Sequence, residues 1–150
     1  MARFDTKGLD DLTEDLKQMG ELAGDLADEM LLGAAEVVKQ SWREAMQRHG
    51  VKLTGQTMDS IGFAKKPKLI GHVKTIDIYP QGYSTYTEAD GKRYRRKNRV
   101  RNAEVAFIAH YGTSKRPGTR FVDTADDLSG QRVVPKMAEI RDNFLKKRGF

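Results

Sequence analysis

A long amphipathic pattern near the start of the chain constrains the fold most. Apolar side chains recur there at alternating spacings of four and three residues, at Leu12, Leu16, Met19, Ala23, Leu26 and Met30. This spacing places them on one face of an α-helix. The stretch from Gly8 to His49 is therefore predicted to form one long helix. Gly50 is expected to end it, because glycine readily adopts the left-handed conformation that closes a helix.

Glycines inside this predicted helix leave two interpretations open. Each glycine costs about 1 kcal/mol relative to alanine in a helix interior. Gly20 and Gly24, with Ala27, would allow another backbone to approach closely, whereas Gly33 would mark a kink or a break. For the apolar stripe itself we favour core packing over a self-assembling coiled coil, because only about three heptads are clean.

The middle of the chain has the pattern of β-structure. A short helix after Val51, capped by Thr54 or Thr57, is expected to carry Met58 and Ile61. A strand is predicted over 62–66 and a longer one over 68–79, where apolar and polar residues alternate. The turn at 80–82 would close the second strand.

A strongly basic segment follows at 83–102, and it is predicted to be a protruding hairpin or loop. Its turn is expected at Ala89-Asp90-Gly91, between short strands that carry Tyr83, Tyr86 and Tyr94. Seven basic residues and no acid then follow, at Lys92, Arg93, Arg95, Arg96, Lys97, Arg99 and Arg101. Because these charges cannot be buried without partners, we expect contact with protein first, with DNA second, and no partner third.

The last third of the chain is predicted to contain a strand, a turn and helices. Residues 103–111 have apolar side chains at both alternating sets of positions, as in a strand that is covered on both faces. An exposed turn is expected at 114–119, and a short helix at Thr124–Leu128, capped by Asp123 or Thr124. A terminal helix is predicted over 131–147, with Ser129 as its cap and Pro135 near its first turn.

Composition limits the class of protein. The 150 residues suit a single domain over 1–150 with a core of moderate size. Without cysteine the chain has no disulfide and no thiolate metal site. We expect no secretory signal and no membrane partner, because no apolar run approaches the roughly 18 residues of a span.

Charge is separated along the sequence. Acids predominate from Asp5 to Glu29, bases dominate from Lys92 to Arg101, and the net charge is +6. This polarity could steer an acidic partner such as DNA, or bring the acidic end of one copy to the basic region of the next.

No pattern points to catalysis. The three histidines, His49, His72 and His110, lie in separate predicted elements, and neither metal-binding nor phosphate-binding motifs occur. His110 is expected to be a packed or interfacial residue. We therefore predict that the chain is not an enzyme and needs no cofactor. A small ribonuclease-like enzyme that uses His110 is kept as a remote alternative.

Two motifs resemble those of a known family. Tyr111, Gly112, Thr113, Phe121 and Ala125 stand in an order that resembles the gene-product-ten-like family of tailed-phage (lambdoid siphophage) morphogenesis proteins, which sit in the neck between head and tail. Upstream, Thr54-Gly55 and Ser60-Ile61 resemble that family's Thr-Gly-(four residues)-Ser-Ile element. This chain departs from the pattern at four positions: Thr57 replaces a leucine, His110 an acid, and Arg120 and Thr124 two prolines.

The resemblance implies an α+β fold, with a long N-terminal helix and a C-terminal helix packed on an antiparallel sheet. That sheet would centre on 68–79 and 103–111. The family role would be a head-to-tail connector subunit, assembled in the host bacterial cytoplasm into a six- or twelvefold ring of the virion neck. Partners would be further copies and the adaptor, portal-side and tail proteins, with possible contact with passing DNA.

Interface candidates follow from the resemblance at Tyr111, Gly112, Thr113, Lys115, Arg116 and Phe121. A tail terminator and a tail-assembly protein are alternatives within this structural class. A basic nucleic-acid-binding accessory protein is the alternative from another class.

Overall fold

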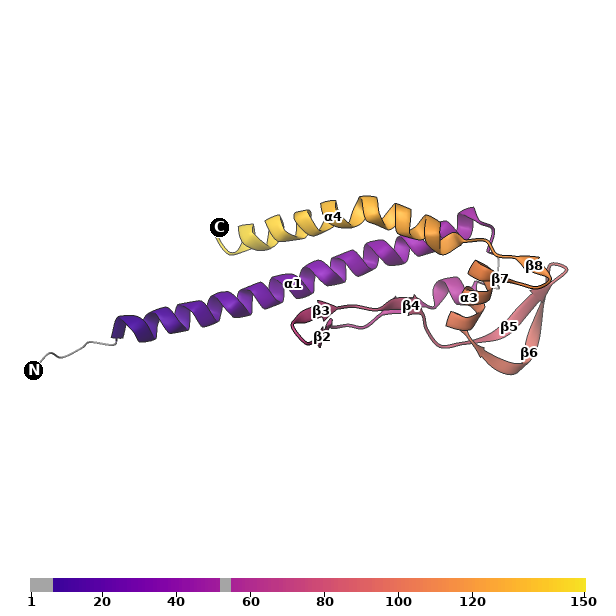
Figure 1. The fold of residues 1–150 in the computed structure, drawn as a ribbon, viewed down its shortest axis with the longest axis horizontal. Coiled ribbons are helices and arrows are strands. Elements are labelled where there is room, and N and C mark those ends of the chain that lie inside the picture. Colours follow the sequence, from indigo (N-terminus) through magenta and orange to yellow (C-terminus); the bar gives the residue numbers. More distant parts are fainter. Residues whose placement is uncertain (1–6, 52–54) are drawn as a thin grey trace, which may run out of the picture.

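A computed structural model describes the backbone of residues 7–51 and 55–150, and the side chains of 12–51, 55–87 and 90–150. The fold is α+β, as predicted: two long helices accompany small antiparallel ladders (Figure 1). The helices are α1 (Lys7–Arg48), α2 (Gln56–Asp59), α3 (Asn102–Tyr111) and α4 (Phe121–Lys147). The strands are β1 (Ile61–Phe63), β2 (Lys68–Ile70), β3 (Val73–Thr75), β4 (Ile78–Pro80), β5 (Tyr83–Ala89), β6 (Lys92–Arg101), β7 (Gly112–Thr113) and β8 (Arg116–Pro117).

Helix α1 confirms the prediction of one long helix. Its 42 residues run without interruption, which corresponds to about 63 Å at 1.5 Å per residue. Gly50 ends it as predicted, with a φ of 62°. The amide of Gly50 donates to the Gln47 carbonyl at 3.1 Å, and that of Val51 donates to the Met46 carbonyl at 2.9 Å. These are the two hydrogen bonds of a Schellman motif, which satisfies the last carbonyl groups of a helix.

Helix α4 runs antiparallel to α1, along the C-terminal half of α1 (Figure 1). Gly33 lies at this contact, since a Cβ added there would collide with the end of the Ile140 side chain. The alternative of a kink or break near Gly33 is therefore wrong, because α1 is continuous there and this glycine makes room for α4. Gly20 has open space around it, and Gly24 faces only the amino group of Lys74. Neither of these two glycines admits another backbone.

The short helix and terminal helix predicted after residue 120 are one continuous helix, α4. Ser129 is not a cap: it lies inside the helix and donates its hydroxyl proton to the Asp126 carbonyl at 3.1 Å. Pro135 also lies inside. The N-cap is Arg120, at a φ of 58°, rather than Asp123 or Thr124.

The predicted antiparallel sheet centred on 68–79 and 103–111 does not form. The strands pair instead as four separate two-stranded ladders: β1–β4, β2–β3, β5–β6 and β7–β8. The expected strand over 68–79 is divided, because Gly71 adopts a φ of 61° and the chain reverses there. The pattern at 62–66 corresponds to the shorter strand β1.

Residues 102–111 form a helix, so the predicted strand at 103–111 is wrong. The buried residues of α3 are Asn102, Val105, Ala106 and His110. These positions recur three and four residues apart, which is the helical period. Because apolar side chains occupy nearly every position here, the sequence fits the two-residue period of a strand as well as the period of a helix. The three alanines favour the helix.

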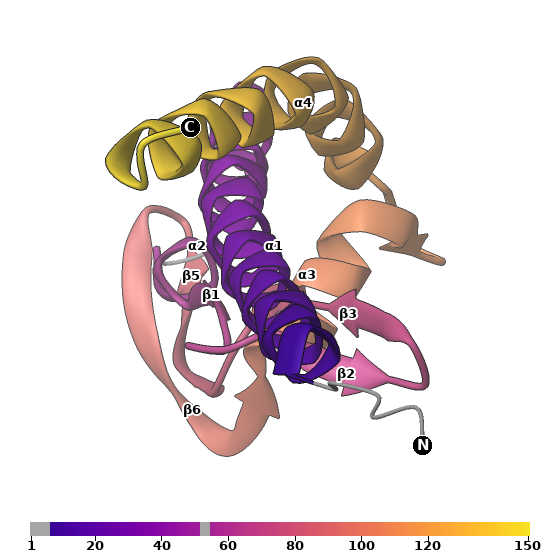
Figure 2. The ribbon, with the colours of Figure 1, turned by 90° about the vertical axis from the view of Figure 1, so that its left-hand side faces the viewer.

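The core lies where the end of α1 meets α2, α3, β1 and the start of α4. Phe121 is fully buried at its centre, and its ring meets that of Trp42 edge-on at 5.8 Å between centroids. Ala45, Met46, Val51, Ile61, Ala106 and Ala125 complete the buried cluster. In both views α4 covers one side of α1, and the ladders with α3 lie on the other (Figures 1 and 2).

Met58 packs against the core from α2, whose N-cap is Gly55 rather than Thr57. Thr54 lies outside the described residues.

Within the described residues, no helix combines the length and the apolar character that a membrane span requires.

Candidate interaction surfaces

The Gly-Thr element forms a small hairpin of β7 and β8 at the end of α3. Thr113 Oγ1 accepts hydrogen bonds from the amides of Lys115, at 3.3 Å, and Arg116, at 3.2 Å. Gly112 adopts φ 84° and ψ −168°, a conformation that is essentially restricted to glycine. The turn expected at 114–119 is shorter: it comprises 114–115, which are exposed, and Arg116–Pro117 form β8. Tyr111, Lys115 and Arg116 are also exposed, so these three interface candidates are accessible to a partner.

Phe121 and His110 lie inside the subunit. Phe121 is fully buried, so it supports the fold and offers no surface to a partner, contrary to the prediction. His110 is 5% exposed, and its ring stands edge-on to Phe121 and Tyr111. The Val122 amide donates to His110 Nδ1 at 3.3 Å, which assigns the proton of the neutral ring to Nε2. His110 therefore joins α3 to α4, and the expectation of a packed residue is confirmed.

The basic segment forms the predicted hairpin of β5 and β6. Asp90 and Gly91 make its two-residue turn, with φ values of 52° and 72°. Two positive φ values are those of the type I′ turn, which matches the twist of a hairpin. The pairing is interrupted further along, where the single residue Thr85 on β5 lies opposite four residues, 96–99, on β6. Strand β6 therefore bows away from β5, as Figure 1 shows.

The seven basic side chains of β6 are exposed, except that of Arg96, which is half-buried. Arg96 Nε donates to the Tyr86 carbonyl at 3.1 Å across the interruption. The Arg93 guanidinium lies 5.8 Å from the centre of the Tyr86 ring. Five bases form no ion pair with any side chain that the structure describes: Lys92, Arg95, Lys97, Arg99 and Arg101. This strand is therefore a concentrated positive surface.

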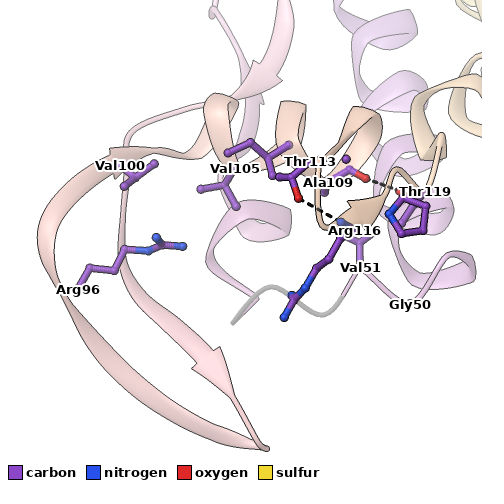
Figure 3. A pocket seen from close by; sticks show the side chains of 12 residues that line it. Gly50, Val51, Arg96, Val100, Val105, Ala109, Thr113, Arg116 and Thr119 are labelled. Carbon is purple, nitrogen blue, oxygen red and sulfur yellow. Dashed lines mark hydrogen bonds between the residues drawn. The ribbon is translucent and has the colours of Figure 1, made fainter.

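A pocket of about 480 Å³ lies between β6, α3 and the β7–β8 hairpin. Apolar residues make up its floor, at Val51, Val100, Val105, Ile108, Ala109 and Pro117. The side chains of Arg96 and Arg116 extend into the space between the strands (Figure 3). The sequence did not indicate this pocket, because it depends on α3 being a helix. The only sequence signal was the strongly apolar character of 103–109.

A second surface is the N-terminal part of α1, which extends beyond α4 and the ladders (Figure 1). Leu12, Leu16 and Met19 are 53%, 59% and 65% exposed. For these residues the expected core packing of the stripe is wrong, because no described element reaches them. Leu26 and Met30, further along the stripe, are partly buried. We call Leu12 to Leu22 the free end of α1.

The free end of α1 lies within an acidic segment. Residues 7–29 contain eight acidic and two basic residues. The basic hairpin lies at the opposite end of the elongated molecule (Figure 1). The two charged regions are therefore separated in space as well as in sequence.

Apolar side chains are also exposed at the β2–β3 hairpin. Leu69, Ile70 and Val73 are 68%, 64% and 62% exposed. The bases beside them already have partners. Lys74 Nζ donates to Asp28 Oδ1 at 2.6 Å and to the Gly24 carbonyl at 2.8 Å, and Lys68 Nζ donates to Asp77 at 3.3 Å.

The described residues contain no group of three or more His, Cys, Asp or Glu that could hold a metal ion. His49 is engaged with the hydroxyl of Thr124 at 2.7 Å, His110 is buried and His72 is exposed. Comparison of the chain with family models, curated proteins and solved structures finds no match.

Proposed function

We propose that this chain is a structural subunit of a tailed phage, a connector component of the neck that assembles as a ring between head and tail. The observation that carries the proposal is the free end of α1. A monomeric protein rarely leaves a row of large apolar side chains without cover, and such rows mark surfaces for other proteins. The exposed Leu12, Leu16 and Met19 fit a subunit whose fold is completed by neighbours.

The separation of charge supports assembly into a ring. An acidic surface at one end and a basic surface at the other favour contacts between unlike patches of neighbouring copies. Contacts of this heterologous kind generate a ring when the rotation between subunits closes. A six- or twelvefold ring is the form that the family resemblance implies.

The basic hairpin would have a second role in this setting. Its exposed arginines and lysines suit contact with an acidic surface on an adaptor or portal-side protein. The Gly-Thr element lies beside it and presents Tyr111, Lys115 and Arg116. These surfaces would join the ring to its neighbours in the virion.

The experiment is to interrupt the gene in a phage that encodes this chain and to examine the particles by electron microscopy. A connector predicts DNA-filled heads and complete tails that remain separate, and purified protein should restore their joining. A tail terminator predicts tails of irregular length, because nothing would stop growth of the tube. A tail-assembly protein predicts that tails are missing. Normal infectious particles would contradict all three roles.

A nucleic-acid-binding accessory protein is the second candidate, supported by the five bases of β6 that form no ion pair with any described side chain. It predicts tight binding to duplex DNA with a steep loss of affinity as salt rises, because phosphate contacts release counterions. Fluorescence anisotropy with labelled DNA over a salt series measures this. Submicromolar affinity at physiological salt in a chain that stays monomeric would favour this candidate over the connector.

A further inference from the structure

The free end of α1 needs a partner, and the pocket between β6, α3 and β7–β8 has the chemistry to receive it. We propose that the free end of α1 from one copy docks in this pocket on the next copy, and that this contact builds the assembly. The inference rests on the proposed self-assembly and identifies the two surfaces that meet.

The two surfaces are complementary in their apolar parts. Leu12, Leu16 and Met19 span eight residues of helix, or about 10 Å along its axis. The pocket has a largely apolar lining, and Ile108 within that lining is 49% exposed. Phe107 and Tyr111 extend the exposed apolar face of α3 beside it, at 63% and 57%. Docking would remove both sets of side chains from water, which is the main driving force for association.

The two surfaces also carry opposite charge. Asp15 is exposed beside the apolar stripe, whereas the exposed Glu14 and Glu21 lie on the opposite face of the helix and add to its negative field at longer range. Arg96 and Arg116 line the pocket, while Lys97 and Arg99 stand exposed on the same bowed strand. Opposite charges around an apolar centre fix the orientation of a complex and accelerate its formation.

Alternative partners for the free end of α1 fit less well. Pairing with the same helix of another copy would bring two acidic segments together, and like charges at close range repel. The apolar tip of the β2–β3 hairpin is the other candidate within the chain. Its neighbouring bases, Lys68 and Lys74, already form ion pairs with Asp77 and Asp28. The pocket beside β6 is apolar, and the bases near it, Arg116, Lys97 and Arg99, form no ion pair with any described side chain.

The contact has to form between copies. The free end of α1 and the pocket lie at opposite ends of one molecule (Figure 1). Each subunit would therefore give its helix to one neighbour and receive a helix from the other. This is a head-to-tail arrangement, and it predicts a specific result when two defective variants are mixed.

The test uses Leu16→Lys, which damages the helix surface, and Ile108→Glu, which damages the pocket. Both side chains are exposed, at 59% and 49%, so each variant should fold. Val134→Lys and Val134→Glu are matched controls, since Val134 is 70% exposed on α4 and away from both surfaces. In analytical ultracentrifugation each interface variant should associate at least about tenfold more weakly than the wild type, and the controls should not.

Mixing the two interface variants gives the decisive readout. Leu16→Lys keeps an intact pocket and Ile108→Glu keeps an intact helix, so the mixture should form one-to-one dimers and no larger species. A mixture without dimers would overturn the inference, as would normal assembly of Ile108→Glu, while the proposed ring function would stand. A wild type that stays monomeric at every concentration would overturn both.

Cross-linking gives a second measurement that does not depend on weakened association. The natural chain has no cysteine, so Leu16→Cys and Ile108→Cys can be combined in one variant. Mild oxidation should produce a ladder of linked subunits. The control that combines Leu16→Cys with Val134→Cys should produce none, and equal ladders from both would refute the docking.

Discussion

Substitution of Gly112 by alanine tests whether the Gly-Thr element is held by close backbone packing. At φ 84° and ψ −168° Gly112 occupies a region that side chains avoid, which costs about 1–3 kcal/mol for another residue. A Cβ added there would also lie 2.5 Å from the Arg116 carbonyl oxygen and 2.7 Å from the Pro117 carbonyl carbon. Because these are backbone atoms of the hairpin, they can yield only if β7 and β8 shift.

The two costs together should lower the free energy of unfolding by roughly 2–5 kcal/mol. This is a large part of the 5–15 kcal/mol that typically stabilises a domain. Urea unfolding followed by circular dichroism should show the midpoint reduced by about 1 M or more. Gly118→Ala should behave similarly, since its Cβ would lie 2.5 Å from the Tyr111 carbonyl carbon.

Gly20→Ala is the matched control. Gly20 lies in the exposed part of α1, and a Cβ there meets no atom within 4 Å. Alanine should cost nothing at this position and gain up to about 1 kcal/mol from its higher helix propensity. An unchanged urea midpoint for Gly112→Ala, or an equal loss for Gly20→Ala, would refute the reasoning.

Two further predictions concern the packing of α1 with α4. Phe121→Ala should lower the free energy of unfolding by about 3–5 kcal/mol in urea titrations, because it empties the centre of the core; a loss below about 1 kcal/mol would contradict that placement. The hydrogen bond from Arg132 to Glu44, at 2.6 Å, lowers the pKa of Glu44 from its ordinary value of 4.5. The contribution of this pair is therefore present above pH 4.5 and is lost as the pH falls through the lowered pKa. Arg132→Gln should reduce the urea midpoint slightly near neutral pH, with a difference that shrinks in acid; a constant difference would argue against the pair.

The sequence was sufficient to predict the structure where a local pattern is compatible with only one conformation. The heptad-like spacing and Gly50 defined α1 to within about one residue at each end. Asp90-Gly91 defined the turn of the basic hairpin, since few other residues tolerate two positive φ values in succession. The basic segment was correctly expected to be an exposed hairpin, although one of its seven bases, Arg96, is half-buried.

The sequence was insufficient where one segment fits the patterns of both a strand and a helix, or where tertiary packing determines the extent of an element. Residues 102–111 are apolar on almost every side, so alternation alone suggested a strand, and the contact of α3 with the core favoured a helix. Pro135 and Ser129 suggested that a helix begins near 131. Proline has a helical φ, but inside a helix it removes one hydrogen bond and its ring clashes with the carbonyl four residues earlier. Packing against α1 carries α4 through this region despite that cost.

The same reasons explain what was missed among the candidate surfaces. The motif places Phe121 among the interface candidates, whereas packing that includes the edge-on contact with Trp42 buries it. The pocket beside β6 was not foreseen, because it exists only between α3 and two hairpins that are distant in sequence. The exposure of Leu12 to Met19 depends on where α4 ends, which a periodic pattern in α1 does not reveal.

Native mass spectrometry of the purified chain, with nucleic acid removed, tests the central claim most directly. Spectra recorded over a range of protein and salt concentrations should contain one closed oligomer of defined stoichiometry, such as a six- or twelvefold ring. Raising the salt concentration should weaken this oligomer, because the acidic and basic surfaces would be screened. A chain that remains monomeric at all concentrations, or that grows without a fixed stoichiometry, would contradict the account.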